Sequence, residues 1–237
     1  MMLEHLKWDS NFFGLKIGRI VCDVRLDEKY LEFLLNDAKI ANYALMYVLL
    51  LDNDVISDVF LSKNTGKLVD RKVIFRMNLN NTTVTPSDEI QDYTGKKLST
   101  DLLDLVYLSG RFSRFKLDEY LPKDAFKRLY KVWIDKSLSG EMADKIFVSI
   151  VNNQVVGFVT LRINDNKGEI GLIAVSEQVQ GRKIGTKLID SCVNYLTQHS
   201  IAKLTVPTQL ANIPACKFYE NYGFEKSSVT DVYHFWL

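Results

Sequence analysis

The chain has 237 residues, 47% of them hydrophobic, which is enough for one large domain or two small ones with an ordinary core. Its 30 basic and 29 acidic residues leave a formal net charge of +1, so no strong field attracts nucleic acid or an anionic membrane. The longest apolar run, ALMYVLLL at residues 44–51, is too short to span a bilayer, and we expect neither nucleic-acid binding nor membrane insertion.

The first part of the chain alternates strand patterns with a helix pattern. The predicted elements are strands at residues 17–24, 44–51 and 70–79 and a helix at residues 28–41. The polar stretch at residues 78–97 separates this region from the rest and has the composition of a linker. We therefore expect a small α/β domain over residues 1–85 and a second domain over residues 86–237.

The second part opens with two helix patterns and continues with three closely spaced strands. The predicted elements are helices at residues 99–109 and 123–138 and strands at residues 145–151, 154–163 and 168–175. The short polar segments VNNQ and NDNKG between the strands are turn signals. These turns predict that the three strands form an antiparallel meander.

A basic turn with two glycines, QGRKIG at residues 180–185, leads directly into an amphipathic helix. Ile184, Leu188, Cys192 and Leu196 recur at every fourth position and mark the face that packs on the sheet. Backbone N–H groups at a helix N-terminus bind anions, so the turn predicts an anion site. The remaining elements are a strand at residues 202–208, a short helix at residues 211–224 and a strand at residues 228–237.

The N-terminus and the cysteines predict a cytoplasmic protein. The opening MMLEHLKWDSNFFG lacks the basic start, apolar centre and cleavage site of a signal peptide. Cys22, Cys192 and Cys216 are few and far apart, which fits a reducing compartment better than a disulfide framework. No cysteine or histidine group has the spacing of metal ligands, so we expect no metal.

The order of the elements and two motifs resemble the GNAT superfamily of acyl-CoA-dependent N-acetyltransferases. QGRKIG is similar to the superfamily's pyrophosphate loop, and NIPACKFYENYGF at residues 212–224 is similar to its second motif. The resemblance implies an α/β (α+β) fold of the GNAT type. Its central sheet is mixed, mostly antiparallel and flanked by helices, and here the smaller α/β domain precedes it. The resemblance also implies acetyl-CoA as cosubstrate.

Acetyl-CoA is expected, by this resemblance, to bind along one strand, the loop after it and the second motif. The implied residues are Leu172, Ile173, Ala174, Val175, Gln180, Gly181, Arg182, Lys183, Ile184, Gly185, Thr186, Asn212 and Tyr219. In the superfamily this strand splays from its neighbour and frees a backbone N–H for the thioester oxygen, here near Ile173 or Ala174. Lys183 stands where a glycine is usual, and we expect a negative φ to keep its N–H toward the phosphate. Gly185 permits close approach of backbone and ligand.

Two residues are candidates for proton transfer. The resemblance implies that Tyr219 protonates the leaving thiolate. A tyrosine with a pKa of about 10 is protonated at neutral pH, whereas a thiol has a pKa of about 8.5, so the hydroxyl is an available donor. Glu169, on the strand before the loop, is the best candidate for a base toward the amine.

Within the superfamily the chain resembles the dTDP-fucosamine N-acetyltransferases of bacterial surface-polysaccharide synthesis. LKWDSNFFGLKIGRI near the start, SGRFSRF at residues 109–115 and the ending YHFWL carry this resemblance. It implies a nucleotide-linked amino sugar as acceptor, with a homodimer left open. Arginine suits phosphate and aromatic rings stack on bases. The expected acceptor-binding residues are therefore Arg111, Phe112, Arg114 and Phe115.

Each assignment has an ordinary structural alternative. The turn before Ile184 is also compatible with a simple surface turn, Tyr219 with a core aromatic and Asn212 with a helix cap. Arg111, Arg114 and Glu169 are also compatible with solvated surface charges. For the function, the alternatives are an acetyltransferase for another small amine or a peptide N-terminus, and a catalytically inactive acyl-CoA-binding protein.

Overall fold

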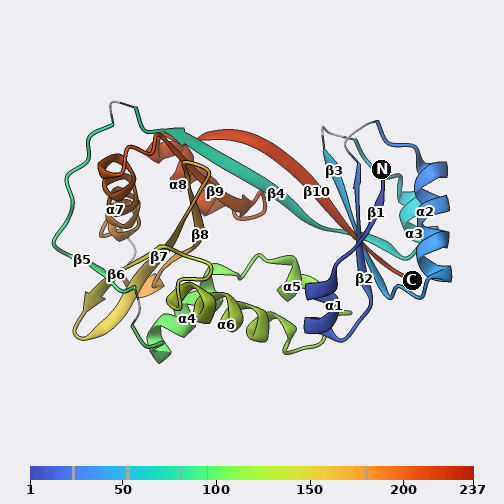
Figure 1. Cartoon of the computed structure of the whole chain (residues 1–237), viewed down its shortest axis with the longest axis horizontal. Coiled ribbons are helices and arrows are strands. Elements are labelled where there is room, and N and C mark those ends of the chain that lie inside the picture. Colours follow the sequence, from blue (N-terminus) through green and yellow to red (C-terminus); the bar gives the residue numbers. More distant parts are fainter. Residues whose placement is uncertain (23–24, 52–53, 81, 95, 180) are drawn as a thin grey trace.

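The computed structural model describes all residues except 23–24, 52–53, 81, 95 and 180 (Figure 1). The helices are α1 (Lys7–Phe13), α2 (Glu28–Ile40), α3 (Asp58–Lys63), α4 (Thr100–Ser109), α5 (Arg114–Leu117), α6 (Ala125–Leu138), α7 (Ile184–Gln198), α8 (Ile213–Tyr222) and the 3-10 turn η1 (Glu177–Val179). The strands are β1 (Leu3–His5), β2 (Ile17–Cys22), β3 (Leu45–Leu51), β4 (Gly66–Asn78), β5 (Ile90–Asp92), β6 (Lys145–Val151), β7 (Gln154–Asn164), β8 (Lys167–Val175), β9 (Lys203–Gln209) and β10 (Glu225–Trp236).

The described strands form one mixed sheet in the order β1-β2-β3-β10-β4-β9-β8-β7-β6-β5. Only β2 with β3 and β8 with β9 pair in parallel; the other described pairs are antiparallel. The long strands β4 and β10 run side by side across the middle of the molecule and join its two halves (Figure 1). The last strand of the chain thus lies inside the sheet, between β3 and β4.

Helices cover both faces of this sheet, and neighbouring residues of a strand face opposite cores. In β3, Tyr47 packs with α4 and α6, whereas Met46 packs with α2 and α3. The uninterrupted apolar run of β3 follows from burial on both faces. In β7, Phe158 joins the α4–α6 side and Val159 joins the α7–α8 side.

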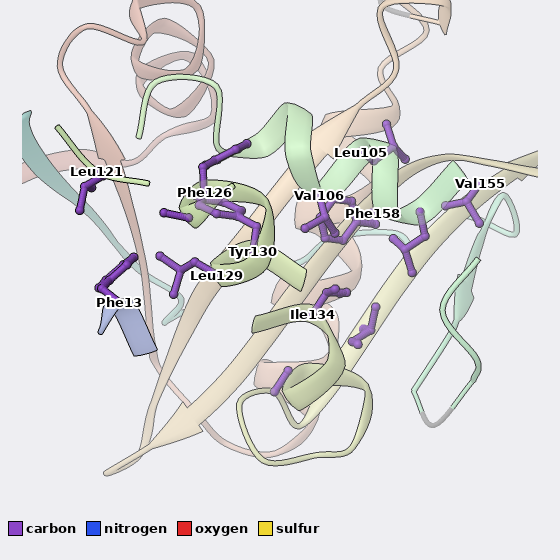
Figure 2. Packing of buried hydrophobic residues seen from close by; sticks show 14 of the residues in the cluster. Phe13, Leu105, Val106, Leu121, Phe126, Leu129, Tyr130, Ile134, Val155 and Phe158 are labelled. Carbon is purple, nitrogen blue, oxygen red and sulfur yellow. The ribbon is translucent and has the colours of Figure 1, made fainter. Parts of the chain in front are cut away.

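The core on the α4–α6 side reaches from the first residues of the chain to the meander. Figure 2 shows its side chains converging from α1, α4, α6 and β7. The residues labelled there are Phe13, Leu105, Val106, Leu121, Phe126, Leu129, Tyr130, Ile134, Val155 and Phe158. This core therefore fixes α1, at the N-terminus, to the part of the chain after residue 86.

Side-chain caps explain where several helices begin. Asp27 accepts hydrogen bonds from the first turn of α2, Ser57 from α3 and Ser99 from α4. Gly223 ends α8 in the left-handed region at φ +110°, as expected from its place after the helix pattern. These caps are local sequence features, so the helix positions follow closely from the pattern of residues.

The predicted fold class and the meander are confirmed: β6, β7 and β8 are antiparallel neighbours in a large mixed sheet flanked by helices. The predicted strand at residues 17–24 ends at Cys22, and its last two positions lie outside the described residues. Short elements were not predicted, namely β1, α1, α3, α5 and β5. β5 lies within the predicted linker and pairs with β6. The boundary near residue 85 stays a prediction.

None of the helices that the structure describes has both the length and the apolar character that crossing a bilayer requires.

A buried polar group connects β10 to the loop after α5. The Nδ1 atom of His234 lies against the Asp118 carboxylate, to which the Trp236 indole N–H also donates at 3.2 Å. Burial lowers the pKa of the His234 imidazole below its ordinary value of 6.5, although Asp118 acts to raise it. His234 is therefore neutral in the folded protein near neutral pH and takes up a proton more readily once the chain unfolds.

We expect the free energy of unfolding to decrease as the pH falls below about 6.5, because the unfolded chain then binds more protons at His234. Burial raises the pKa of Asp70 to about 6, which acts in the opposite direction as the pH falls from about 6 toward its ordinary 3.8. His234→Asn keeps a donor for Asp118 but cannot titrate. Urea unfolding should show that the free energy of unfolding decreases less between about pH 7 and about pH 5 in this variant than in the parent protein. Equal losses in both proteins would contradict the assignment.

Candidate active site

Two cavities lie along the sheet and share a wall. The first has a volume of about 470 Å³ and is formed by the C-terminal half of β8, the turn before α7, the end of α4 and α8. The second has about 660 Å³ and extends from β8 and β9 to α1, α5 and β3. The residues common to both linings are Ser109, Ile173, Asn212, Ala215 and Tyr219. The cavities thus meet where α8 faces β8.

The first cavity brings together most of the predicted acetyl-CoA residues. Its lining includes Ile173, Ala174, Val175, Gly181, Lys183, Ile184, Gly185, Thr186, Asn212 and Tyr219. Leu172 lines the second cavity instead, and Arg182 is exposed and lines neither. Gln180 lies outside the described residues.

Strand β8 separates from β9 just before the first cavity. The two strands pair only at Gly168 with Leu204 and at Glu169 with Thr205. An irregularity in the β7–β8 pairing follows, where the Leu172 N–H donates to the Thr160 hydroxyl at 2.8 Å. Beyond it, β8 has a strand neighbour only on the β7 side among the described residues. The expected donors near Ile173 lie on this stretch, which pairs with β7 but has no strand partner on its β9 side, and their role stays a prediction.

The turn into α7 departs from our expectation for Lys183. This residue has φ +59° and ψ +19° as the N-cap of α7, so the expected negative φ is wrong. The turn needs a left-handed residue here to direct the chain into the helix. A side chain with a Cβ is strained in that region, which accounts for the glycine that is usual at this place.

Gly185 lies where α7 passes α8. A Cβ on this residue would be 3.3 Å from the Phe218 ring, closer than most such contacts. Gly185 also lines the first cavity. The absence of a side chain therefore serves the packing of α8 against α7 directly, in addition to leaving the cavity open.

Tyr219 is buried, with 3% of its surface exposed, and lies between Phe75, Phe218 and Phe224. Burial, followed by the charge of Cys216, raises the pKa of its hydroxyl, which is therefore protonated at neutral pH. No described residue hydrogen-bonds to this hydroxyl, although the side chain lines both cavities. The hydroxyl proton is thus available to a molecule bound at the junction.

Asn212 caps a helix, one of the two alternatives for this residue, and its contact with acetyl-CoA stays a prediction. Its side-chain oxygen accepts a hydrogen bond from the Ala215 N–H at 3.4 Å, at the start of α8. It also lies in the wall shared by both cavities. A second support for α8 was missed: the Tyr222 hydroxyl donates to Asp190 of α7 at 2.6 Å. Tyr222 lies within the second motif and Asp190 lies in α7 beyond the first, and their pairing depends on how the helices cross.

The predicted acceptor-binding residues divide between the two cavities. Arg111 lines the first cavity and forms an ion pair with Glu177 at 3.0 Å. Arg114 and Phe115 line the second cavity. Phe112 is in neither lining, and the Arg111 guanidinium lies over its ring at 5.1 Å. The SGRFSRF segment therefore does not form one wall of a single cavity. Arg111 lies in the turn that follows α4, and Arg114 begins α5 after that turn.

Glu169 lines the second cavity from β8 and is exposed there. Other residues of this cavity were not predicted as site residues. They are Trp8 and Asp9 of α1, Tyr47 of β3 and Asp70 of β4. Trp8 and Asp9 lie in the WDSNFFG segment that carries part of the family resemblance, whereas Tyr47 and Asp70 have no motif around them. In the part of the chain that the structure describes, no group of three or more histidine, cysteine or acidic residues is placed to hold a metal ion.

Comparison with known proteins identifies the relatives of this architecture. Residues 111–224 match the model of a protein family described as "Acetyltransferase (GNAT) family". A dTDP-fucosamine acetyltransferase of Escherichia coli is 27% identical over 99% of this chain and 96% of its own length. The spore coat polysaccharide biosynthesis protein SpsD of Bacillus subtilis is 28% identical over 52% of this chain, which spans only 43% of that protein.

Solved structures share the fold. A GCN5-related N-acetyltransferase from Sphaerobacter thermophilus aligns with a TM-score of 0.59, covering 98% of this chain and 75% of its own. At 13% sequence identity, this likeness concerns the fold alone.

We expect Lys183→Gly to raise the free energy of unfolding by up to about 1 kcal/mol, because glycine relieves the left-handed strain but adds freedom to the unfolded chain. Asn166 is a matched control with the same φ of +59°. Asparagine tolerates the left-handed region, so Asn166→Gly should raise the free energy of unfolding by less. Urea unfolding of both variants measures the difference. A loss of stability in Lys183→Gly would instead indicate a stabilising contact of the lysine side chain.

Proposed function

We propose, from the match of residues 111–224 to the GNAT acetyltransferase family, that this chain acetylates a nucleotide-linked amino sugar. The acetyl group comes from acetyl-CoA, and the acceptor amine attacks it directly while both substrates are bound. The observation that carries the proposal is the meeting of two cavities at Tyr219. One cavity then holds the donor and the other the acceptor.

The first cavity suits acetyl-CoA by its chemistry. The turn before α7 presents backbone N–H groups and the positive end of the helix dipole, which favour a pyrophosphate. Lys183 adds a positive charge at the same place. The stretch of β8 near Ile173, without a strand partner on its β9 side, offers backbone groups for the amides of the pantetheine arm and for the thioester oxygen. A donor aimed at that oxygen stabilises the charge that develops on it.

Tyr219 has the properties of the acid that protonates the thiolate. Its raised pKa keeps the proton on the hydroxyl at neutral pH, so the hydroxyl can donate a hydrogen bond that strengthens as negative charge develops on the departing sulfur. Glu169, in the second cavity, is the proposed base for the amine. An amine beside the oxygens of a sugar ring is less basic than lysine, so a weak base suffices.

The second cavity suits a large acceptor that reaches beyond the transferase domain. Its wall includes residues of α1, β3 and β4, which precede residue 86. The relative from Escherichia coli, named for dTDP-fucosamine, aligns with this N-terminal part as well as with the motifs. We extend its named substrate class to this chain, together with a role in polysaccharide synthesis and a cytoplasmic location.

We expect Tyr219→Phe to lower kcat roughly 10²–10⁴-fold, the usual contribution of a positioned acid. The affinity for acetyl-CoA should change little, because the thioester sulfur accepts a strong hydrogen bond only as charge develops. Tyr222→Phe is a matched control that removes a hydroxyl from the same helix. It should reduce stability by about 1 kcal/mol through the lost bond to Asp190, with a far smaller effect on turnover.

Single-turnover rates and urea unfolding of the two tyrosine variants separate these effects. Full turnover by Tyr219→Phe would remove this residue from the mechanism.

We expect kcat/KM for dTDP-4-amino-4,6-dideoxygalactose to exceed that for the free amino sugar by roughly a hundredfold, because binding of the nucleotide supports the transition state. Release of free thiol from acetyl-CoA measures the rate with each acceptor. UDP-linked amino sugars and a peptide amine complete the screen. Faster transfer to the peptide than to every nucleotide sugar would favour the peptide N-terminus as acceptor.

A further inference from the structure

The end of the second cavity farthest from Tyr219 has no role in the acetyl transfer itself. Its walls come from α1, β3, β4 and α5, and they combine aromatic with charged side chains. The residues that matter are Trp8, Asp9, Tyr47, Asp70 and Arg114, all of which line the cavity.

Trp8 is the outer layer of a stack of side chains. Its ring lies parallel to that of Phe12, with 5.0 Å between the centroids and 8° between the planes. The Arg128 guanidinium lies 5.2 Å from the centre of the same Phe12 ring. Despite this packing, 45% of the Trp8 surface is exposed. One face of the Trp8 indole is held by Phe12, and an indole held in this way at a cavity wall is a rigid surface on which another flat ring can stack.

Arg114 is a cation without a close counterion. Its guanidinium lies 4.3 Å from the Tyr47 ring centre and 4.6 Å from that of Phe115. Among the described residues, no carboxylate approaches it within the 4.0 Å of an ion pair; Asp9 and Asp70 act on it from farther away. Arg114 stays charged, since arginine is not deprotonated in proteins. Its donors therefore remain open to an anion in the cavity.

The two neighbouring acids oppose such an anion least at mildly acidic pH, where they take up protons more readily than ordinary carboxylates do. Burial raises the pKa of Asp9, and it raises the pKa of Asp70 to about 6. Arg111 offers no alternative in this cavity, because it pairs with Glu177 beside the first one. Arg114 is thus the arginine of the SGRFSRF segment that is placed to meet an acceptor.

We propose that this end of the cavity binds the nucleoside diphosphate part of the acceptor, with the base stacked on Trp8 and a phosphate paired with Arg114. The proposal rests on the proposed function in one respect, that the linked sugar carries its amine toward Tyr219. A cavity of about 660 Å³ lies within the range of roughly 300–1,000 Å³ found for small-molecule sites. Trp8 then determines which acceptors bind, without contact to the reacting atoms.

The test measures the binding of dTDP to the full chain by calorimetry, with coenzyme A at saturation. Coenzyme A occupies the first cavity, so the nucleotide cannot report on that site. We expect Trp8→Leu to weaken dTDP binding roughly ten- to hundredfold, the effect of losing one base-stacking ring. Trp8→Phe keeps an aromatic ring and should retain most of the affinity. Arg114→Gln should weaken the binding of dTDP but not that of thymidine, which lacks phosphate.

Matched controls exist for both side chains. Tyr30 of α2 is 44% exposed and stacks on Phe33, but it lies outside the cavity lining. Tyr30→Leu should leave dTDP affinity unchanged, as should Arg76→Gln, because Arg76 is exposed and lies outside both cavity linings. Melting curves of each variant detect any loss of folding, and Trp8→Phe remains informative if Trp8→Leu is unstable.

Two outcomes separate this proposal from the proposed function. Unchanged dTDP affinity in Trp8→Leu and Arg114→Gln would overturn the nucleotide site even if the parent protein acetylates a nucleotide sugar. Conversely, the nucleotide site stands if dTDP binding depends on both residues while no nucleotide sugar is acetylated. In that case the reaction assigned to the junction is wrong.

Discussion

The separation of β8 from β9 is the constraint on which the rest of the site depends. Two residue pairs hold the strands together, and after Glu169 they diverge. A sheet that continued to pair would satisfy its own backbone groups and leave no opening between α7 and α8. Because the pairing stops, the first cavity forms and α8 can place Tyr219 at its inner end. The cost is a stretch of β8 with unpaired backbone groups, which a bound ligand can satisfy.

Helix α8 is held in this opening from three directions. Asn212 caps its start, Gly185 lets it lie close to α7, and Tyr222 ties its end to Asp190. The interactions are individually modest, but together they fix a side chain whose hydroxyl has no described partner. A free but immobile donor is what an acid in a transfer reaction requires, since its orientation needs no reorganisation as charge develops.

The sequence predicted best what depends on short-range signals. Asn152 and Asn153 adopt positive φ values in the turn between β6 and β7, and asparagine favours such turns, so the meander could be predicted. The possible helix cap at Asn212 is a signal of the same short range, and the structure has this cap. The loop before α7 was found by its charge and glycines, although the sign of φ at Lys183 was not, because that angle depends on how the turn enters the helix.

Features that depend on distant parts of the chain were missed. α1 has seven residues and no side-chain cap at Leu6, so its position rests on packing with the core that Phe13 joins. Arg111 and Arg114 are three residues apart, yet they face different cavities. No local pattern distinguishes them. The second cavity is assembled from strands on both sides of β10, and pairing of this kind has no signature in one segment.

The position of β10 also bears on how the chain reaches this structure. β3 and β4 are made early on the ribosome, but β10, which lies between them, is made last. Until residues 225–236 emerge, each of these strands has one edge without its final neighbour. Strand pairing between distant parts of a chain is slow, and strand edges without a partner can pair with other chains. A deletion within residues 225–236 would therefore remove the neighbour of β3 and β4 and act on the opposite end of the sequence.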